Sequence, residues 1–206
     1  MKKIVFCLLV SLSVFALAGA PFAKMTFYLI DNFEDNSFSN KWYVFDNVEG
    51  TLVDNPGLDI EDSVSEACGE KSLKLIGKTN NWYVGGMGTL LEVDGMDYSR
   101  IVIDVYGSSN FGKIKLELFE KEKDKVDQKG NLSETKWVVE IPVLGEGFTR
   151  YSVPFSSFYS EDTKDSGKVV FHGRQGGNIS KLQAIFVASS KEGEFDCMVD
   201  NLMFTF

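Results

Sequence analysis

Hydrophobic and polar residues alternate along most of the chain, in short runs that turn-forming residues separate. In the clearest run, residues 113–119 (KIKLELF), apolar side chains follow polar ones at every second position. A period of two is the pattern of a β-strand with one buried face. Similar runs occupy residues 72–76, 101–106, 137–142, 151–155, 182–188 and 198–204. Because Gly, Asn, Asp or Ser closes these runs and no amphipathic helix intervenes, the sequence predicts an all-β sandwich or barrel.

Two stretches lack this alternation and are expected to form long loops. Residues 50–70 are acidic and rich in turn formers, and residues 120–136 carry charges of both signs. The second stretch contains Gly130-Asn131, a pair that suits an exposed hairpin tip. The sequence shows neither an internal repeat nor a low-complexity linker, so we expect one domain to occupy residues 24–206.

Residues 1–23 have the three parts of a secretory signal peptide. A basic start (MKK) precedes an apolar run over residues 4–17, and small residues follow it. The spacing of small residues favours cleavage after Ala18, within the range 18–23. The apolar run is shorter than the roughly 20 residues that cross a bilayer. We therefore expect a secreted, periplasmic or cell-surface protein with no membrane span after signal removal, and the double lysine is typical of a bacterial source.

Composition and charge restrict the partners of the chain. With 44% hydrophobic and 13% aromatic residues, it can build a sizeable core. The net charge of -9 disfavours nucleic acid, whose phosphates need a basic surface, and also an anionic membrane. The same charge is compatible with neutral sugars and divalent cations. We expect a monomer.

Cysteine and histidine content limits the chemistry. Cys7 lies in the signal peptide, so Cys68 and Cys197 remain, either as a disulfide or as two buried thiols. Two cysteines cannot form a tetrahedral zinc site. One histidine excludes a two-histidine hydrolytic site, and no Gly-x-Ser-x-Gly motif is present. We expect no catalysis, with a polysaccharide lyase or glycosidase as the enzymatic alternative.

Seven segments, in order along the chain, resemble the family 11 carbohydrate-binding modules and the related galactose-binding-like jelly rolls. They are 30–35 (IDNFED) with 41–43 (KWY), 69–74 (GEKSLK), 81–86 (NWYVGG), 102–105 (VIDV), 114–116 (IKL), 153–158 (VPFSSF), and 190–195 (SKEGEF) with 199–202 (VDNL). The resemblance implies an antiparallel jelly-roll β-sandwich of two sheets and about ten strands. It also implies non-catalytic binding of a polysaccharide, with β-glucan as the first choice, in the cleft of a concave sheet.

The resemblance further implies a structural calcium ion near the chain ends. Calcium prefers several oxygen ligands from carboxylates and backbone carbonyls. Glu34 and Asp200 stand at the matching positions for the carboxylates, and the carbonyls around Gly69 and Lys71 would complete the shell. The alternative is that these are ordinary acids near a turn. Two further acids are reserve candidates: Asp31 and Asp35.

Trp82 and Tyr83 are the first candidates for sugar contact, because Gly85-Gly86 beside them leaves room for a ligand. Aromatic faces cover the flat C–H surface of a pyranose, and carboxylates and amides bind its hydroxyls. Strand alternation predicts that only one of the two rings faces the cleft. The other candidates lie on the non-core sides of the central strands or in a loop: Asp104, Tyr106, Glu117, Trp137, His172 and Arg174. Burial in the core is the alternative for each aromatic residue.

The chain departs from the family in its aromatic residues. Val187 stands where the family tends to have a cleft tyrosine. Fewer aromatic residues imply a different glycan, weaker binding or no sugar binding. The alternative function is a cell-envelope structural or interaction protein with a galactose-binding-like fold and no sugar ligand.

Overall fold

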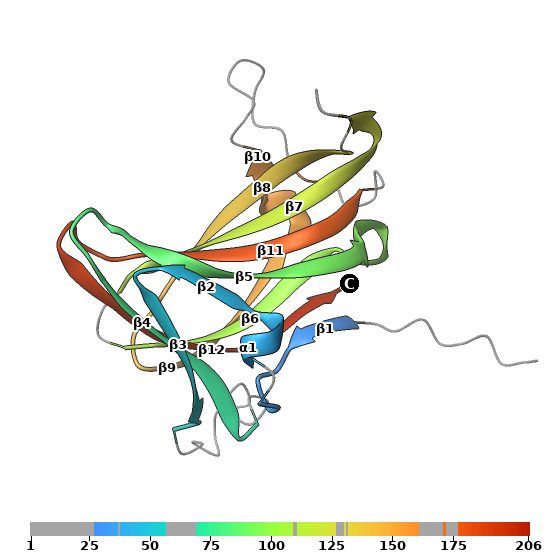
Figure 1. The fold of residues 1–206 in the computed structure, drawn as a ribbon. Coiled ribbons are helices and arrows are strands. Elements are labelled where there is room, and N and C mark those ends of the chain that lie inside the picture. The colour runs from blue at the N-terminus through green and yellow to red at the C-terminus, as the bar shows by residue number, and fades with distance from the viewer. Residues whose placement is uncertain are drawn as a thin grey trace, which may run out of the picture.

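Twelve strands form two six-stranded sheets that pack as a sandwich (Figure 1). This computed structural model describes residues 27–36, 38–56, 69–108, 111–126, 130, 132–160, 171 and 177–206, without the side chains of 122–125. The predicted all-β jelly-roll sandwich is confirmed, with twelve strands in place of about ten. Besides strands, the described residues contain the four-residue helix α1 (Phe38–Lys41) and two short 3₁₀ turns, Gly95–Asp97 and Phe155–Ser157.

The first sheet holds the strands in the order β3-β4-β12-β6-β9, and β1 also pairs with β12. Its strands are β1 (Phe27–Asp31), β3 (Val48–Asp54), β4 (Lys71–Thr79), β6 (Arg100–Gly107), β9 (Gly147–Pro154) and β12 (Gly193–Thr205). All of these pairs are antiparallel. Strand β12 lies at the centre of this sheet and pairs with three strands, β1, β4 and β6.

The second sheet has the order β10-β8-β7-β11-β5-β2, and its pairs are also antiparallel. Its strands are β2 (Tyr43–Asp46), β5 (Tyr83–Asp94), β7 (Lys113–Val126), β8 (Leu132–Pro142), β10 (Tyr159–Ser160) and β11 (Asn178–Val187). Successive strands of the chain often lie in different sheets. For example, the chain crosses the sandwich between β2 and β3 and again between β4 and β5 (Figure 1).

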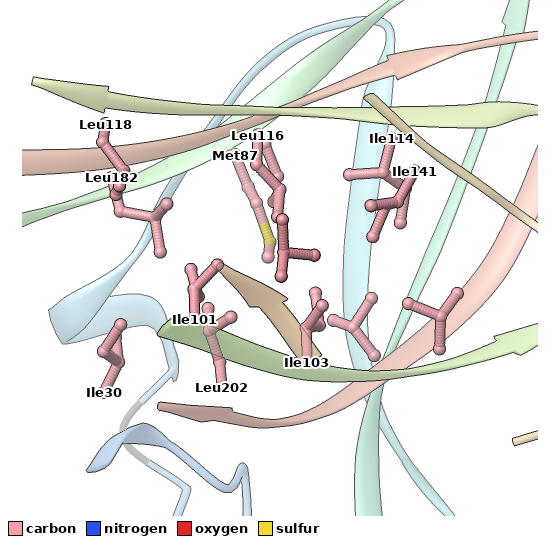
Figure 2. Packing of buried hydrophobic residues seen from close by; sticks show 14 of the residues in the cluster. Ile30, Met87, Ile101, Ile103, Ile114, Leu116, Leu118, Ile141, Leu182 and Leu202 are labelled. Carbon is pink, nitrogen blue, oxygen red and sulfur yellow. The ribbon is translucent and has the colours of Figure 1, made fainter. Parts of the chain in front are cut away.

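The core lies between the sheets, where the apolar side of each alternating strand faces the other. Figure 2 shows Met87, Leu116 and Leu182 of the second sheet opposite Ile101 and Ile103 of the first. These side chains are at most 2% exposed. The alternation seen in the sequence therefore reports which side of each strand is buried.

Strand β12 contains a bulge that shifts its alternation. Val199 and Leu202 both point into the core although they are three residues apart, because β12 has an extra residue against β6 between Asp200 and Met203. Asn201 adopts φ 45°, in the left-handed region that asparagine tolerates better than most residues. The bulge also marks a change of neighbour, since residues 193–199 pair with β4 and residues 202–205 pair with β1.

Two expected loops are partly strand. Residues 48–54 form β3, and strands β7 and β8 extend into the 120–136 segment, where Glu120 pairs with Thr135 and Lys121 with Glu134. Charged residues can continue a strand pair that leaves the edge of the core, because backbone pairing does not need an apolar side chain. Residues 57–68 lie outside the described part of the chain.

The predicted N-terminal signal peptide, with Cys7, and Cys68 also lie outside the described residues. Cys197 is a free thiol that is buried in the core. Burial, together with the charge of Asp196, raises the pKa of its thiol well above the usual value. Among the described residues, no helix combines the length and the apolar character needed to cross a membrane.

An ion pair between the buried Asp104 and the partly exposed Arg150 joins strands on the outer side of the first sheet next to the bulge. The Asp104 carboxylate is fully buried and receives two hydrogen bonds from Arg150, with Nε at 2.7 Å and Nη2 at 2.6 Å. The Asn201 amide also donates to Asp104 Oδ2 at 3.0 Å. Strands β6, β9 and β12 are therefore joined by side chains as well as by backbone hydrogen bonds.

We expect Arg150→Ala to lower the free energy of unfolding by about 3 kcal/mol, because it leaves a buried carboxylate without its counter-charge. Urea denaturation followed by circular dichroism measures this loss. Arg100→Ala is the matched control, since Arg100 also bridges β6 to β9, through Ser152 Oγ at 2.8 Å, but on the exposed surface. The control should change stability by less than about 0.5 kcal/mol. Equal losses in the two variants would contradict the role assigned to the pair of Asp104 and Arg150.

Candidate functional site

The outer face of the second sheet carries aromatic and polar side chains in rows that cross the strands. One row runs from Tyr43 on β2 over Gly88 on β5 and Gln183 on β11 to Glu117 on β7. Directly opposed residues of neighbouring strands have their side chains on the same side of the sheet. Because Glu117 alternates with core residues, this row points away from the core. We call this surface the outer aromatic face.

Two aromatic rings of the edge strand β2 lie over glycines of β5. A Cβ atom on Gly88 would overlap the Tyr43 ring, and a Cβ atom on Gly86 would overlap the Phe45 ring. The two ring centroids are 6.1 Å apart with an interplanar angle of 31°. Gln183 Nε2 donates to the Tyr43 hydroxyl at 3.0 Å. The two glycines thus let both rings lie across the sheet, where a flat ligand can stack on them.

Tyr83 extends this face at the start of β5. Its neighbour Val84 points into the core, so the Tyr83 ring points outward and is 38% exposed. The Tyr83 hydroxyl donates a hydrogen bond to Asp46 Oδ2. Burial and this hydrogen bond, with the negative charges of Asp46 and Glu117, raise the pKa of Tyr83 to about 12. The hydroxyl therefore keeps its proton at any physiological pH.

Glu117 supplies a carboxylate in the middle of the same sheet. It is 7% exposed, and its Oε1 lies 3.5 Å from the Nζ atoms of both Lys115 and Lys136. In the next row the Lys181 ammonium lies 3.5 Å from the centroid of the Phe119 ring. Charged groups held by such contacts are ordered, so they can offer hydrogen bonds to hydroxyl groups without further loss of side-chain freedom.

Trp82 and Tyr83 are both exposed, whereas strand alternation predicted that one would face the ligand. Trp82 belongs to the turn between β4 and β5, has φ 69° and is 51% exposed. Its backbone pairs with Lys191 and Ala188 in the turn before β12. Alternation does not apply outside a strand, so the indole lies beside the turns and Tyr83 belongs to the outer aromatic face.

The prediction that Asp104, Tyr106 and Glu117 line one surface is wrong. Asp104 and Tyr106 belong to β6 of the first sheet, and Glu117 belongs to β7 of the second. Asp104 is also fully buried in its pair with Arg150. Tyr106 is half-buried with its ring edge against Phe148, at a centroid distance of 5.3 Å. Similar alternation in two strands does not reveal that they lie in different sheets.

Trp137 lies in the core. Burial in the core was the alternative to sugar contact for each aromatic candidate. It is 8% exposed and its ring packs against Phe171 at a centroid distance of 5.3 Å. Its indole nitrogen donates to Glu120 Oε2 at 2.9 Å. His172 and Arg174 lie outside the described residues.

The four predicted calcium ligands meet where β1 ends and β4 begins. Glu34 Oε1 accepts hydrogen bonds from the amides of Glu70 at 2.9 Å and Lys71 at 3.1 Å. Gly69 has φ 68°, and a Cβ atom there would overlap the Glu34 carboxylate. Only glycine allows this approach of the two segments. Glu34 therefore lies directly against residues 69–71.

Asp200 faces this junction from the bulge of β12. Its Oδ1 accepts a hydrogen bond from the Asn201 amide at 2.6 Å. Its Oδ2 is buried and has no hydrogen-bond partner among the described residues. Burial raises the pKa of Asp200 to about 8, to which the charges of Asp104 and Glu34 contribute, although the Asn201 amide lowers it. A buried acceptor without a partner beside a second carboxylate is what a bound cation would satisfy.

Asn55, which the sequence did not single out, connects the parts of this junction. Its Nδ2 lies 3.0 Å from the Gly69 carbonyl and 3.4 Å from the Lys71 carbonyl, and its Oδ1 accepts from Ser72. A hydrogen bond from Asn55 also lowers the pKa of Asp200. Two carboxylates and two carbonyl oxygens fit the oxygen preference of calcium. Among the described residues, no group of three or more His, Cys, Asp or Glu side chains is placed to hold a metal ion, so backbone oxygens would be essential to the shell.

The reserve acids have other contacts. Asp31 is buried, with Oδ1 accepting from the Phe33 amide at 2.9 Å and Oδ2 from the Trp42 indole at 2.7 Å. Lys41 Nζ lies 3.3 Å from Asp31 Oδ2. Asp35 is exposed on the turn after β1. Asp31 thus explains the spacing between the acidic segment and Trp42 in structural terms, because it anchors the end of α1 to β1.

Sequence reasoning missed Tyr43, Phe45 and Gln183 as part of the outer aromatic face. The available signal was the spacing of Gly86 and Gly88, two residues apart on one side of a strand. Such glycines indicate a close approach by a neighbouring group. The identity of that group depends on the pairing of β2 with β5, which the sequence did not reveal.

No protein-family model matches the sequence, and no curated protein sequence matches it. Solved structures do match. The family 11 carbohydrate-binding module of the cellulosomal cellulase Lic26A-Cel5E of Clostridium thermocellum is similar at TM-score 0.57 and 16% identity, over 87% of this chain and 94% of that chain. The family 11 module from Clostridium thermocellum in complex with a β-1,3-1,4-mixed-linked tetrasaccharide gives TM-score 0.57 and 16% identity, over 87% and 95%.

A region of an exo-β-agarase is also similar, at TM-score 0.57 and 14% identity, over 87% of this chain and 25% of the agarase. At identities of 14–16%, these likenesses concern the fold alone. The chain has the two-sheet jelly-roll fold of the family 11 carbohydrate-binding modules, as its sequence motifs predicted.

Proposed function

We propose that this protein binds polysaccharide, without catalysis, on the outer aromatic face of its second sheet. The observation that carries the proposal is the set of rings of Tyr43, Phe45 and Tyr83 on that face, two of them lying over glycines. Stacked aromatic rings match the C–H surface of pyranoses, and Glu117 and Gln183 offer acceptors and donors for hydroxyls. The face is open, which suits a chain that extends beyond the protein.

A β-glucan is the first ligand to test. A structure with the same fold holds a β-1,3-1,4-mixed-linked tetrasaccharide, and the sequence motifs resemble that family. The N-terminal signal sequence would place the protein outside the cytoplasm, where such polysaccharides occur. Val187, opposite Tyr83 in the β5–β11 pair, provides no ring, so the stacking surface is concentrated on β2 and β5.

A calcium ion at the junction of β1, β4 and β12 is the second part of the proposal. The residues that would hold it are Glu34, Asp200 and the carbonyls of Gly69 and Lys71. Bound calcium would supply positive charge to the buried, unpartnered Asp200 oxygen. It would thereby stabilise the fold on the side of the sandwich opposite to the sugar-binding face, with no direct role in sugar contact.

Phe45→Ala and Tyr83→Ala should each lower the affinity for a mixed-linkage β-glucan about fivefold, because each removes a stacking contact of about 1 kcal/mol. Affinity gel electrophoresis across a panel of soluble polysaccharides measures the change. Phe27→Ala is the control, since Phe27 is 45% exposed on β1 of the other sheet, and its loss should leave retardation unchanged. A folded wild-type protein that no glycan retards would contradict sugar binding and favour the envelope interaction role.

Asp200→Asn should have opposite effects with and without calcium. With a chelator at pH 8, the substitution removes a buried carboxylate that the charges of Asp104 and Glu34 repel. We therefore expect the melting temperature to rise by about 3 °C. In calcium the variant should melt below the wild type, because a ligand is lost. Differential scanning calorimetry compares both states, with Asp196→Asn, a partly exposed acid of the same strand, as the control. A wild-type melting temperature that does not respond to calcium would refute the site.

The raised pKa of Asp200 also predicts that the stability of the protein depends on pH when a chelator removes calcium. The folded pKa of Asp200 is about 8 and the ordinary value is 3.8, so between these values the folded state keeps a proton that the unfolded chain has released. Stability should therefore fall as pH rises from about 4 to about 8 and level off above that. Asp200→Asn should remove this part of the slope, measured by urea denaturation at a series of pH values.

A further inference from the structure

The first sheet carries a groove that shares only Asp46 with the proposed sugar site. It has a volume of about 910 Å³ and is lined by the β2–β3 turn, by β4 and by β12. Every lining residue belongs to the described part of the chain. The groove is as large as many small-ligand sites. It lies mainly over the first sheet, whereas the outer aromatic face belongs to the second.

An apolar side chain lies between two carboxylates in this groove. Ile76 on β4 is 40% exposed and pairs with Glu49 on β3 at one side and with Asp196 on β12 at the other. Since neighbouring strands are about 4.8 Å apart, each acid lies next to the isoleucine. The aliphatic part of a ligand's lysine or arginine side chain could thus lie on Ile76, with a carboxylate on either side for its charged end.

The groove has a negative charge that its own lysines do not cancel. Lys74 pairs with Asp196 at 3.6 Å, and Lys78 pairs with Glu194 at 2.5 Å, a contact that raises the pKa of Lys78. The four carboxylates and two ammonium groups of the lining leave a net charge of -2. The remaining acids are Asp46, which accepts from Tyr83, and Glu49, whose side chain has no partner among the described residues.

Two amides complete the polar lining. The side chains of Asn47 and Asn80 make no hydrogen bond to any described residue, and each offers a donor and an acceptor. This combination matches the backbone of an extended peptide. The lining contains a single aromatic residue, Phe195, which is 2% exposed, so a pyranose would find no ring on which to stack.

We propose that this groove binds a basic, extended peptide segment of a partner protein. The stem of a lysine or arginine lies on Ile76, its cationic head lies against Glu49, and Asn47 and Asn80 bind the peptide backbone. This role is distinct from sugar binding, because the groove lies mainly over the first sheet and shares only Asp46 with the outer aromatic face. One molecule could hold a polysaccharide and a basic protein segment together.

The test uses an N-acetylated, C-amidated Lys-Ser-Lys-Ser-Lys peptide and the purified protein at low salt. A second peptide carries N-acetyllysine at the same three places, which keeps the stem and removes the charge. Amide chemical shifts, recorded by NMR, report where each peptide binds. We expect the charged peptide to shift the resonances of residues 46–49, 74–80 and 194–196, and the acetylated peptide to shift none.

Glu49→Gln should weaken binding of the charged peptide about fivefold, the effect of losing a charge contact of about 1 kcal/mol. Glu92→Gln, an exposed acid on β5, makes the same charge change away from the groove and should leave binding within twofold. Equal effects of the two variants would show general attraction to an acidic protein and would overturn the proposal. So would equal binding of the acetylated peptide, or shifts confined to other surfaces. Shifts of residues 74–80 and 194–196 by a neutral oligosaccharide in place of the peptide would also overturn it.

Discussion

The bulge at Asp200 and Asn201 is the constraint on which the rest of the sandwich depends. Strand β12 pairs with β6 along one side, while on the other side β4 gives way to β1 at this point. A regular strand would have turned Leu202 and Phe204 to the solvent, because side chains alternate with a period of two. One extra residue restores both to the core. On that side Asp200 and Asn201 pair with neither strand, which leaves a gap in the pairing between β4 and β1.

The polar groups around that gap follow from the bulge. Asn201, in the left-handed conformation, brings its amide to Asp104, which Arg150 holds from β9. Asp200 remains with one oxygen that has no hydrogen-bond partner among the residues that the structure describes, and it faces Glu34 and the glycine turn at Gly69. A protein rarely leaves a buried acceptor unsatisfied. The bulge therefore serves the core and leaves this acceptor as the group that the proposed calcium ion would satisfy.

The two outer surfaces differ in chemistry although the same β2–β3 crossover contributes to both. On the second sheet, glycines of β5 let the rings of β2 lie flat, which creates an apolar surface with polar groups beside it. On the first sheet, charged residues alternate with the core residues of β4 and β12 and leave a polar groove. Asp46, at φ 59°, contributes to both, because its carboxylate binds the Tyr83 hydroxyl and also lines the groove.

The sequence by itself determined the all-β class and seven of the strands, because alternation is a local property. The cluster of Glu34, Gly69, Lys71 and Asp200 was expected from the resemblance of short motifs to a known family. The sequence also identified Tyr83 through its glycine neighbours. Only the tertiary structure decided that β6 and β7 lie in different sheets, which separates Asp104 and Tyr106 from Glu117. It likewise decided that Tyr43 and Phe45 lie over Gly88 and Gly86 and that Trp137 is buried. These facts depend on which strands pair across long stretches of chain, and the alternation within one strand is the same whichever partner it finds.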